Sequence, residues 1–266
     1  MKRILILLMF CVGAITAHAQ ALQLLPNGHS HNDYTRQNPL QDALDNGFTS
    51  LEIDVYSKKG QIRVSHFPIL LGTKPTLDAL YLQPLAQRIQ TNGGTVYPGD
   101  STQLVLMIDL KKDKAELYTL LRRAFQPYEH LIEVHEGERR RWGPLKLVLS
   151  GGPPLDSLRS ASKRYFSVDG HRHQWALDLD HGFMPRASTN WRKHFKWKGR
   201  GPMPAEERRK LDRMVEEAHA RGRKIRFWAL PNRPEVWKVV HEAGVDWINV
   251  DNLAEYRDFY LSQIRP

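Results

Sequence analysis

Apolar and polar positions form short β-type runs along this chain, and longer amphipathic stretches separate them. The short runs are rich in aliphatic residues, and several alternate between apolar and polar positions, as strands do. We predict strands at Leu22–Leu25, Ser50–Val55, Leu104–Leu110, Leu145–Leu149, Tyr165–Val168, Arg186–Thr189, Ile225–Ala229 and Trp247–Val250. Strands that alternate with helices are typical of βα units, so the pattern predicts an α/β fold, a (β/α)8 TIM barrel.

The clearest predicted helices each end at a glycine, the residue that best tolerates a left-handed cap. They are Pro39–Asn46 before Gly47, Ala205–Ala220 before Gly222, and Pro234–Ala243 before Gly244. The stretch Leu131–Gly143 fits neither period, and we interpret it as an insertion. At 266 residues and 41% hydrophobic content, the chain suits a single barrel domain.

The first nineteen residues have the pattern of a secretory signal peptide. Lys2 and Arg3 precede a short apolar run, and Ala17-His18-Ala19 is a small-x-small cleavage site. We therefore predict a signal peptide over 1–19, a mature domain over 20–266, and an exported protein, periplasmic or secreted. The only cysteine, Cys11, lies in this segment, which excludes disulfides and cysteine metal sites from the mature chain.

The charge balance is basic. Lys and Arg total 39 against 29 Asp and Glu, and removing Lys2 and Arg3 leaves 37 against 29, a net charge of +8. A basic surface favours anionic partners such as phosphate esters, lipid headgroups or nucleic acid, but more often it is simply a solvated exterior.

Candidate chemistry is concentrated where the predicted strands end. The segment Gly28–Tyr34 reads Gly-His-Ser-His-Asn-Asp-Tyr, and Glu52 and Asp54 alternate with apolar residues, so both carboxylates lie on one face of a strand. Two acids that point into a barrel repel each other unless a cation lies between them. The pattern therefore predicts a divalent metal ion.

Two later segments add to this set. His66 ends a short alternating run, and Asp109 and Lys111 stand at the end of the otherwise apolar strand Leu104–Leu110. Asn32, Glu52, Asp54 and Asp109 are oxygen donors suited to Mg²⁺ or Ca²⁺. Two histidines beside such an ion can divide the roles of general base and general acid.

These residues resemble a known superfamily. Ser30-His31-Asn32, Glu52-x-Asp54 and His66 resemble the catalytic half of phosphoinositide-specific phospholipase C, and Leu106–Lys111 resembles a metal-ligand segment of spider-venom sphingomyelinase D. The whole mature chain is similar to the branch of "altered inheritance of mitochondria" protein 6, within the phospholipase C-like and glycerophosphodiester phosphodiesterase superfamily. The resemblance implies a phosphoric diester hydrolase with a phospholipase C-like barrel.

The resemblance also implies roles for single residues. It implies His31 and His66 as the acid–base pair and Asn32, Glu52, Asp54 and Asp109 as the metal ligands. His29 has no strict counterpart, and we place it with Lys111 and Trp228 as substrate-side residues. Asp251 is predicted to cap the final helix.

One departure bears on the substrate. Glycerophosphodiester phosphodiesterases carry Pro-Glu-Asn after the first His, whereas this chain has Asn38-Pro39-Leu40 without an acid. The resemblance therefore does not favour glycerophosphodiesters. The bacterial phospholipases that use an arginine in place of metal also fit poorly, because Glu52 and Asp54 would then lack their cation.

Two alternatives stand beside the hydrolase. The barrel could bind a phosphate-bearing ligand or an anionic surface without turnover, or the basic chain could bind nucleic acid, although it has no nucleic-acid-binding signature. We expect a phosphodiester or phospholipid-headgroup substrate, no nucleic acid and no obligate protein partner. Trp191–Lys198 is basic and aromatic, which suits either a peripheral membrane contact or an ordinary exposed loop.

Overall fold

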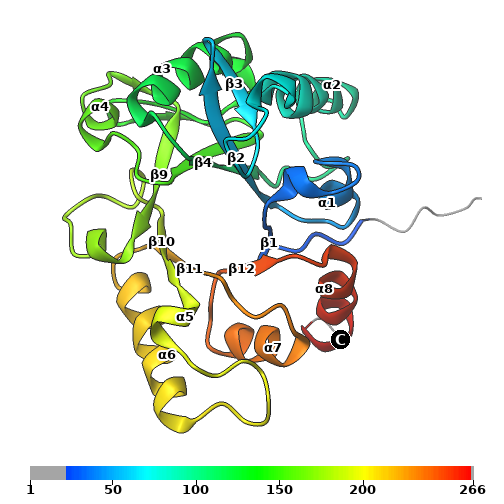
Figure 1. Cartoon of the computed structure of the whole chain (residues 1–266), viewed down its shortest axis with the longest axis vertical. Coiled ribbons are helices and arrows are strands. Elements are labelled where there is room, and N and C mark those ends of the chain that lie inside the picture. The colour runs from blue at the N-terminus through cyan, green and yellow to red at the C-terminus, as the bar shows by residue number, and fades with distance from the viewer. Residues whose placement is uncertain (1–21, 265–266) are drawn as a thin grey trace, which may run out of the picture.

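The computed structural model describes residues 22–264, so the predicted signal peptide at 1–19 lies outside the described residues. Parallel strands form a closed barrel with helices around it (Figure 1). In sheet order from the first strand, the barrel strands are β1 (Gly28–Ser30), β12 (Trp247–Val250), β11 (Lys224–Trp228), β10 (Arg186–Asn190), β9 (Phe166–His171), β7 (Leu145–Ser150), β4 (Leu104–Leu110) and β2 (Ser50–Lys58). β1 pairs with both β12 and β2, which closes the barrel as predicted.

The helices lie outside this ring of strands. They are α1 (Gln41–Asp45), α2 (Gln83–Thr91), α3 (Lys114–Phe125), α4 (Leu155–Arg159), α5 (Trp191–His194), α6 (Ala205–His219), α7 (Pro234–Glu242) and α8 (Leu253–Phe259). Short helical turns are η1 (Asp33–Thr35), η2 (Leu71–Thr73), η3 (Asp78–Leu82), η4 (Gln126–Leu131), η5 (Arg172–Gln174) and η6 (Tyr260–Ile264). Within the described part of the chain, no helix combines the length and the apolar character needed to cross a bilayer.

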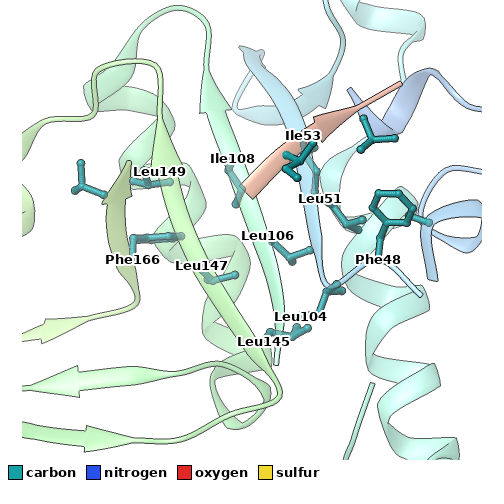
Figure 2. Packing of buried hydrophobic residues seen from close by; sticks show 14 of the residues in the cluster. Phe48, Leu51, Ile53, Leu104, Leu106, Ile108, Leu145, Leu147, Leu149 and Phe166 are labelled. Carbon is teal, nitrogen blue, oxygen red and sulfur yellow. The ribbon is translucent and has the colours of Figure 1, made fainter. Parts of the chain in front are cut away.

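The alternation of β2 separates core from site. Leu51, Ile53 and Val55 point outward and pack with Phe48 and with aliphatic residues of β4 and β7 beneath the helices (Figure 2). Glu52 and Asp54 therefore point into the barrel. The interior also holds a small separate apolar cluster of Val105, Met107, Val148 and Trp247. This cluster forms an apolar layer on the amino-terminal side of the carboxylates that point into the barrel.

The first strand differs from our prediction. Leu22–Leu25 contributes only one isolated bridge, between Leu25 and Phe48, and the barrel strand is Gly28–Ser30. β1 is short and made of Gly, His and Ser, so it lacks the apolar signal of the other strands. Gly28 is needed there, because a Cβ would lie 2.9 Å from the ring of Phe48.

The stretch Leu131–Gly143 is also more regular than we predicted. It contains a hairpin of β5 (Val134–Glu136) and β6 (Arg139–Arg141), which β8 (Lys163–Arg164) extends into a small antiparallel sheet. Its alternation is hidden in the sequence because most of its positions are charged. The short alternating run before His66 forms a strand, β3 (Gln61–Val64), which pairs antiparallel with β2.

Candidate functional site

A cavity of about 600 Å³ opens at the carboxyl ends of the barrel strands. The predicted residues that line it are His31, Asn32, Glu52, His66, Asp109, Lys111 and Trp228. Sequence reasoning did not place the others in the site, chiefly Ser150, Asp169, His171, Arg192, Arg226, Asn249 and Asp251. The structure thus brings together groups from strands that are distant in the sequence.

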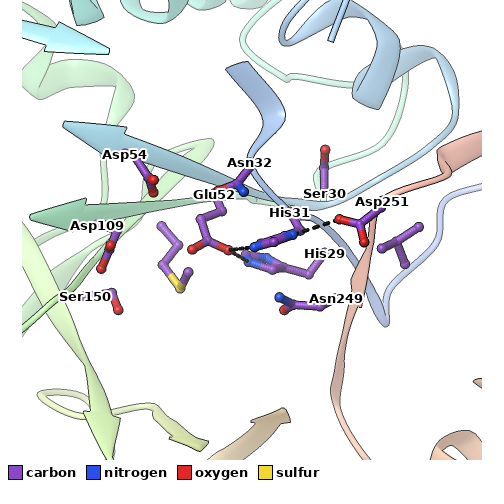
Figure 3. A network of polar contacts seen from close by, with 12 residues as sticks. His29, Ser30, His31, Asn32, Glu52, Asp54, Asp109, Ser150, Asn249 and Asp251 are labelled. Carbon is purple, nitrogen blue, oxygen red and sulfur yellow. Dashed lines mark hydrogen bonds and ion pairs between the residues drawn. The ribbon is translucent and has the colours of Figure 1, made fainter. Parts of the chain in front are cut away.

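Three carboxylates form the acidic part of the cavity. Glu52 and Asp54 project from β2, and Asp54 is in register with Asp109 on the neighbouring strand β4. One oxygen from each of the three lies within 4.8 Å of the others, and the side chains face a common space (Figure 3). Gly151 leaves room for Asp109, because a Cβ there would lie 2.7 Å from its Oδ1 atom.

Asp54 supplies the test of whether a cation fits. It is buried, and its Oδ2 atom accepts hydrogen bonds from Tyr34 and His66. The same atom forms an ion pair with Lys111 at 2.8 Å. Its Oδ1 atom has no hydrogen-bond partner among the described residues. Burial raises the pKa of Asp54, and the charge of Glu52 adds to this effect. An unsatisfied buried oxygen and mutual repulsion between acids both fit a divalent cation.

Lys111 partly balances these charges. Its Nζ atom lies 2.8 Å from Asp54 and 2.5 Å from Asp109. Burial opposes charging of this lysine, but the two carboxylates outweigh it and hold the pKa of Lys111 above its usual value. Lys111 is therefore a cation that lies between two predicted metal ligands.

His31 is held from the end of the neighbouring strand β12. Its Nδ1 atom lies 2.8 Å from Asp251 Oδ1, and its Nε2 atom points toward Glu52 at 4.0 Å (Figure 3). Burial lowers the pKa of His31, but Asp251 and Glu52 together outweigh burial and raise it. The predicted capping role of Asp251 is wrong, because the side chain of Asn252 accepts the cap hydrogen bond from Glu255.

His66 is oriented by a second pair of contacts. Its Nδ1 atom lies 2.9 Å from Asp54 Oδ2 and 3.1 Å from the hydroxyl of Tyr34, which also donates to Asp54. With Nδ1 engaged by the carboxylate, Nε2 is left for a ligand. We did not select Tyr34, although it belongs to the same sequence segment as His31.

His29 does not line the cavity, so the prediction that it contacts the substrate is wrong. It is fully buried, with Nδ1 2.7 Å from Ser50 Oγ and Nε2 3.4 Å from Glu52. Burial, aided by the charge of Arg226, lowers its pKa to about 3. His29 is thus a neutral ring beneath Glu52, which it helps to orient.

Buried charges also support Glu52 from β11 and β9. Arg226 donates to Glu52 at 2.9 Å, to Asn249 at 2.8 Å and to Asp169 at 3.3 Å. Burial alone would raise the pKa of Glu52, but Arg226 and then His29 outweigh it and hold the pKa below its usual range. Glu52 is therefore an ionised carboxylate deep in the barrel.

Two other residues of the early motif are structural. Ser30 donates to buried Asp33, which also accepts from Tyr81 and from the backbone of Leu40. Arg36 then binds the backbone oxygens of His31 and Asp251. This scaffold fixes the turn that carries His31 and Asn32.

The basic aromatic segment is not an aromatic surface. Trp191, Phe195 and Trp197 are all buried in the core, and only charged neighbours such as Arg192 and Lys196 are exposed. The aromatic signal there reflects packing around α5. The prediction of a membrane contact through these rings is therefore wrong, because the rings are buried.

Comparison with known proteins identifies the family. Residues 21–169, more than half of the chain, match the AIM6-like phosphodiesterase domain. The chain belongs to this family. It is 26% identical to an altered inheritance of mitochondria protein 6 homolog from Arthroderma benhamiae, over 87% of this chain and 83% of that protein.

A second relative agrees with this assignment, and a solved structure shares the fold. The chain is 27% identical to altered inheritance of mitochondria protein 6 from Eremothecium gossypii, over 90% of this chain and 71% of that protein. It also resembles the crystal structure of a glycerophosphodiester phosphodiesterase from Agrobacterium tumefaciens, with a TM-score of 0.55, 16% identity and coverage of 90% and 100%. This AIM6-like domain thus has the barrel fold of that enzyme.

Proposed function

We propose that this AIM6-like protein is an exported, metal-dependent phosphoric diester hydrolase. The observation that carries the proposal is the trio Glu52, Asp54 and Asp109 within 4.8 Å, with a buried Asp54 oxygen that has no partner among the described residues. A hydrolase needs a cation for the phosphate and two proton-transfer groups, and His31 and His66 adjoin this trio.

Glu52, Asp54 and Asp109, with Asn32 beside them, would hold Mg²⁺ or Ca²⁺. The ion would bind a phosphate oxygen and offset the negative charge that develops there. His29 and Arg226 keep Glu52 ionised and oriented for this role. Lys111 then becomes a candidate phosphate contact, and Trp228 lines the wall available to a leaving group.

The two histidines transfer protons. One Nε2 atom takes the proton of the attacking hydroxyl, from water or from the substrate, and the other histidine protonates the leaving alcohol. Asp251 orients His31, while Asp54 and Tyr34 orient His66. The substrate class is a soluble phosphodiester or a phospholipid headgroup.

The test is a panel of phosphodiesters that includes bis(p-nitrophenyl) phosphate, assayed with Mg²⁺, Ca²⁺ or EDTA, with ³¹P NMR of the products. His31→Ala and His66→Ala should each lower turnover by on the order of 10² or more. His130→Ala is the matched control, because His130 is exposed on η4. Turnover that persists in both active-site variants would refute the acid–base assignment.

Export is tested separately. If Met1–Ala19 is a signal peptide, protein recovered outside the cytoplasm begins near Gln20, which N-terminal sequencing would detect. Recovery of the uncleaved chain in the cytoplasm would refute this part.

Lys111 favours a second candidate, a phosphate binder that needs no metal. It already offsets part of the negative charge of Asp54 and Asp109. Phosphodiester binding in the presence of EDTA, together with no turnover when Mg²⁺ or Ca²⁺ is supplied, would support the binder over the hydrolase.

A further inference from the structure

The loop after β3 exposes apolar side chains. Residues 66–70, His-Phe-Pro-Ile-Leu, are all exposed, and the exposed fractions are 62% for Phe67, 66% for Ile69 and 71% for Leu70. These are the three highest values among the exposed large hydrophobic residues of the described chain. Clustered exposure of this kind marks an interaction surface, whereas single exposed apolar residues need no explanation.

The loop is held by hydrogen bonds that flanking residues donate to its backbone carbonyls. The hydroxyl of Ser65 donates to the carbonyl of Phe67, and the backbone and hydroxyl of Thr73 both donate to the carbonyl of Leu70. Leu70 has a positive φ of 52°, which is unfavourable for a leucine. Hydrogen bonds thus hold the loop in a conformation that leaves the apolar side chains in solvent.

The position of the loop connects it to the candidate site. It begins at His66, whose ring lies 4.4 Å from the ring of Phe67 in an edge-on contact. The backbone of Ser65 donates to the carbonyl of Asp54, so the loop leaves the barrel at the level of the acidic trio. A surface bound by this loop would therefore face the cavity.

The charges beside the loop are basic. Lys74 follows it, and its carbonyl accepts from Arg63 on β3. Lys58 and Lys59 are exposed at the β2–β3 turn. The four residues of β3 separate this turn from the loop, which corresponds to a distance of about 13 Å. Apolar side chains beside lysines suit an anionic lipid surface.

A protein partner fits less well. A stable protein interface buries about 800 Å² on each side, more than a five-residue stretch offers, whereas insertion into a membrane interface needs only a few apolar side chains and nearby cations.

We propose that the 66–70 loop docks this protein on an anionic phospholipid surface. Ile69 and Leu70 enter the headgroup region, and Lys58, Lys59 and Lys74 contact the lipid phosphates. The docking brings the cavity beside His66 to lipid-borne phosphodiesters, and in this respect the inference rests on the proposed function. It narrows the substrate class to diesters presented at a membrane surface.

The experiment measures binding of the mature chain, residues 20–266, to sucrose-loaded vesicles of phosphatidylcholine, with and without phosphatidylglycerol. The double variant Ile69→Ser, Leu70→Asn leaves Phe67 and His66 intact, and asparagine tolerates the positive φ at position 70. We expect the wild-type protein to bind the anionic vesicles more strongly, and the double variant to lose at least about tenfold in partition coefficient.

Trp142→Ser is the matched control. Trp142 is 47% exposed but precedes β7, at the opposite end of the barrel. This variant should bind within about twofold of the wild type. Equal binding by the double variant and the wild type, equal losses in both variants, or no wild-type binding would each overturn the proposal.

Hydrolysis of soluble bis(p-nitrophenyl) phosphate by the wild-type protein, measured without vesicles, tests the proposed function separately. Vesicle binding without hydrolysis would leave docking standing and reject the hydrolase. Hydrolysis without vesicle binding would support the hydrolase and reject the docking.

Discussion

The two halves of the barrel mouth serve the site in different ways. The N-terminal half, from β1 to β4, supplies both candidate histidines and the acidic trio, all between His31 and Asp109. The C-terminal half, from β9 to β12, supplies Asp169, Arg226, Asn249 and Asp251, which contact those groups or one another. The C-terminal half thus holds His31 and supports Glu52, whereas His66 is held by Asp54 and Tyr34 of the N-terminal half.

The difference teaches where function is visible in a sequence. In the N-terminal half, acids and histidines interrupt apolar strands at short spacing, so each stands out. In the C-terminal half, an arginine or an aspartate near a strand end looks like any surface charge until the barrel closes. This comparison can be tested from both sides.

The largest effect should come from the N-terminal half. Asp54→Asn removes a proposed metal ligand and a partner of His66 and Lys111, and we expect phosphodiester turnover to fall by on the order of 10³. Steady-state kinetics with a metal titration measures this. Asp45→Asn, at an exposed position on α1, is the matched control. If both variants retain similar turnover, the acidic trio is not the reactive centre.

The next test breaks the support from the C-terminal half. Arg226→Met leaves Glu52 and Asp169 without their buried cation, and we expect the free energy of unfolding to fall by about 3 kcal/mol. Urea denaturation measures the change. Arg233→Met removes an exposed arginine from a pair with Glu235 and should change stability little. An unchanged midpoint for Arg226→Met would show that Glu52 does not depend on it.

A smaller effect is expected for the residue that positions His31. Asp251→Asn keeps the shape but removes the charge beside Nδ1, so kcat should fall by about tenfold to a hundredfold with little change in KM. Asp258→Asn is the exposed control on α8. A change confined to KM would assign Asp251 to substrate binding instead.

The smallest effect concerns the helices of the C-terminal half, away from the mouth. Burial lowers the pKa of His241 to about 4, against about 6.5 unfolded. Its contribution to stability is therefore complete above pH 6.5 and is lost as the pH falls toward 4, by about 1.5 kcal/mol between pH 6.5 and 5.

His241→Phe should flatten this acid dependence in urea denaturation at several pH values. His29, whose pKa is also lowered, adds a slope of the same sign that the variant keeps. An unchanged slope would show that His241 is solvated in the folded protein.

The sequence predicted the barrel well because its periodicity reports burial directly. Seven predicted strands overlap observed strands, and the capped helices before Gly47, Gly222 and Gly244 are present. β1 escaped prediction because closure, rather than hydrophobicity, determines its place. The arginine-rich hairpin β5–β6 escaped for a similar reason, since pairing partners hold it without an apolar face.

The candidate site was partly readable for the same physical reasons. Glu52, Asp54 and Asp109 could be found because an acid at an inward strand position demands compensation. The compensating Arg226 gave no such signal, since its partner is 174 residues away. The residue pattern alone did not separate His29 from His31, and only the resemblance assigned His31 to the acid–base pair. In the structure His29 is buried under Glu52, whereas His31 faces the cavity.

The seam between β1 and β12 has a consequence for how the molecule matures. His31 meets Asp251 across 220 residues, and Arg36 ties the same two strand ends together. A growing chain therefore contains Glu52, Asp54 and Asp109 long before the end of β12 has been synthesised. Asp251, which follows β12, is the residue that orients His31. The contact that orients His31 can therefore form only after β12 has joined β1 at the end of synthesis.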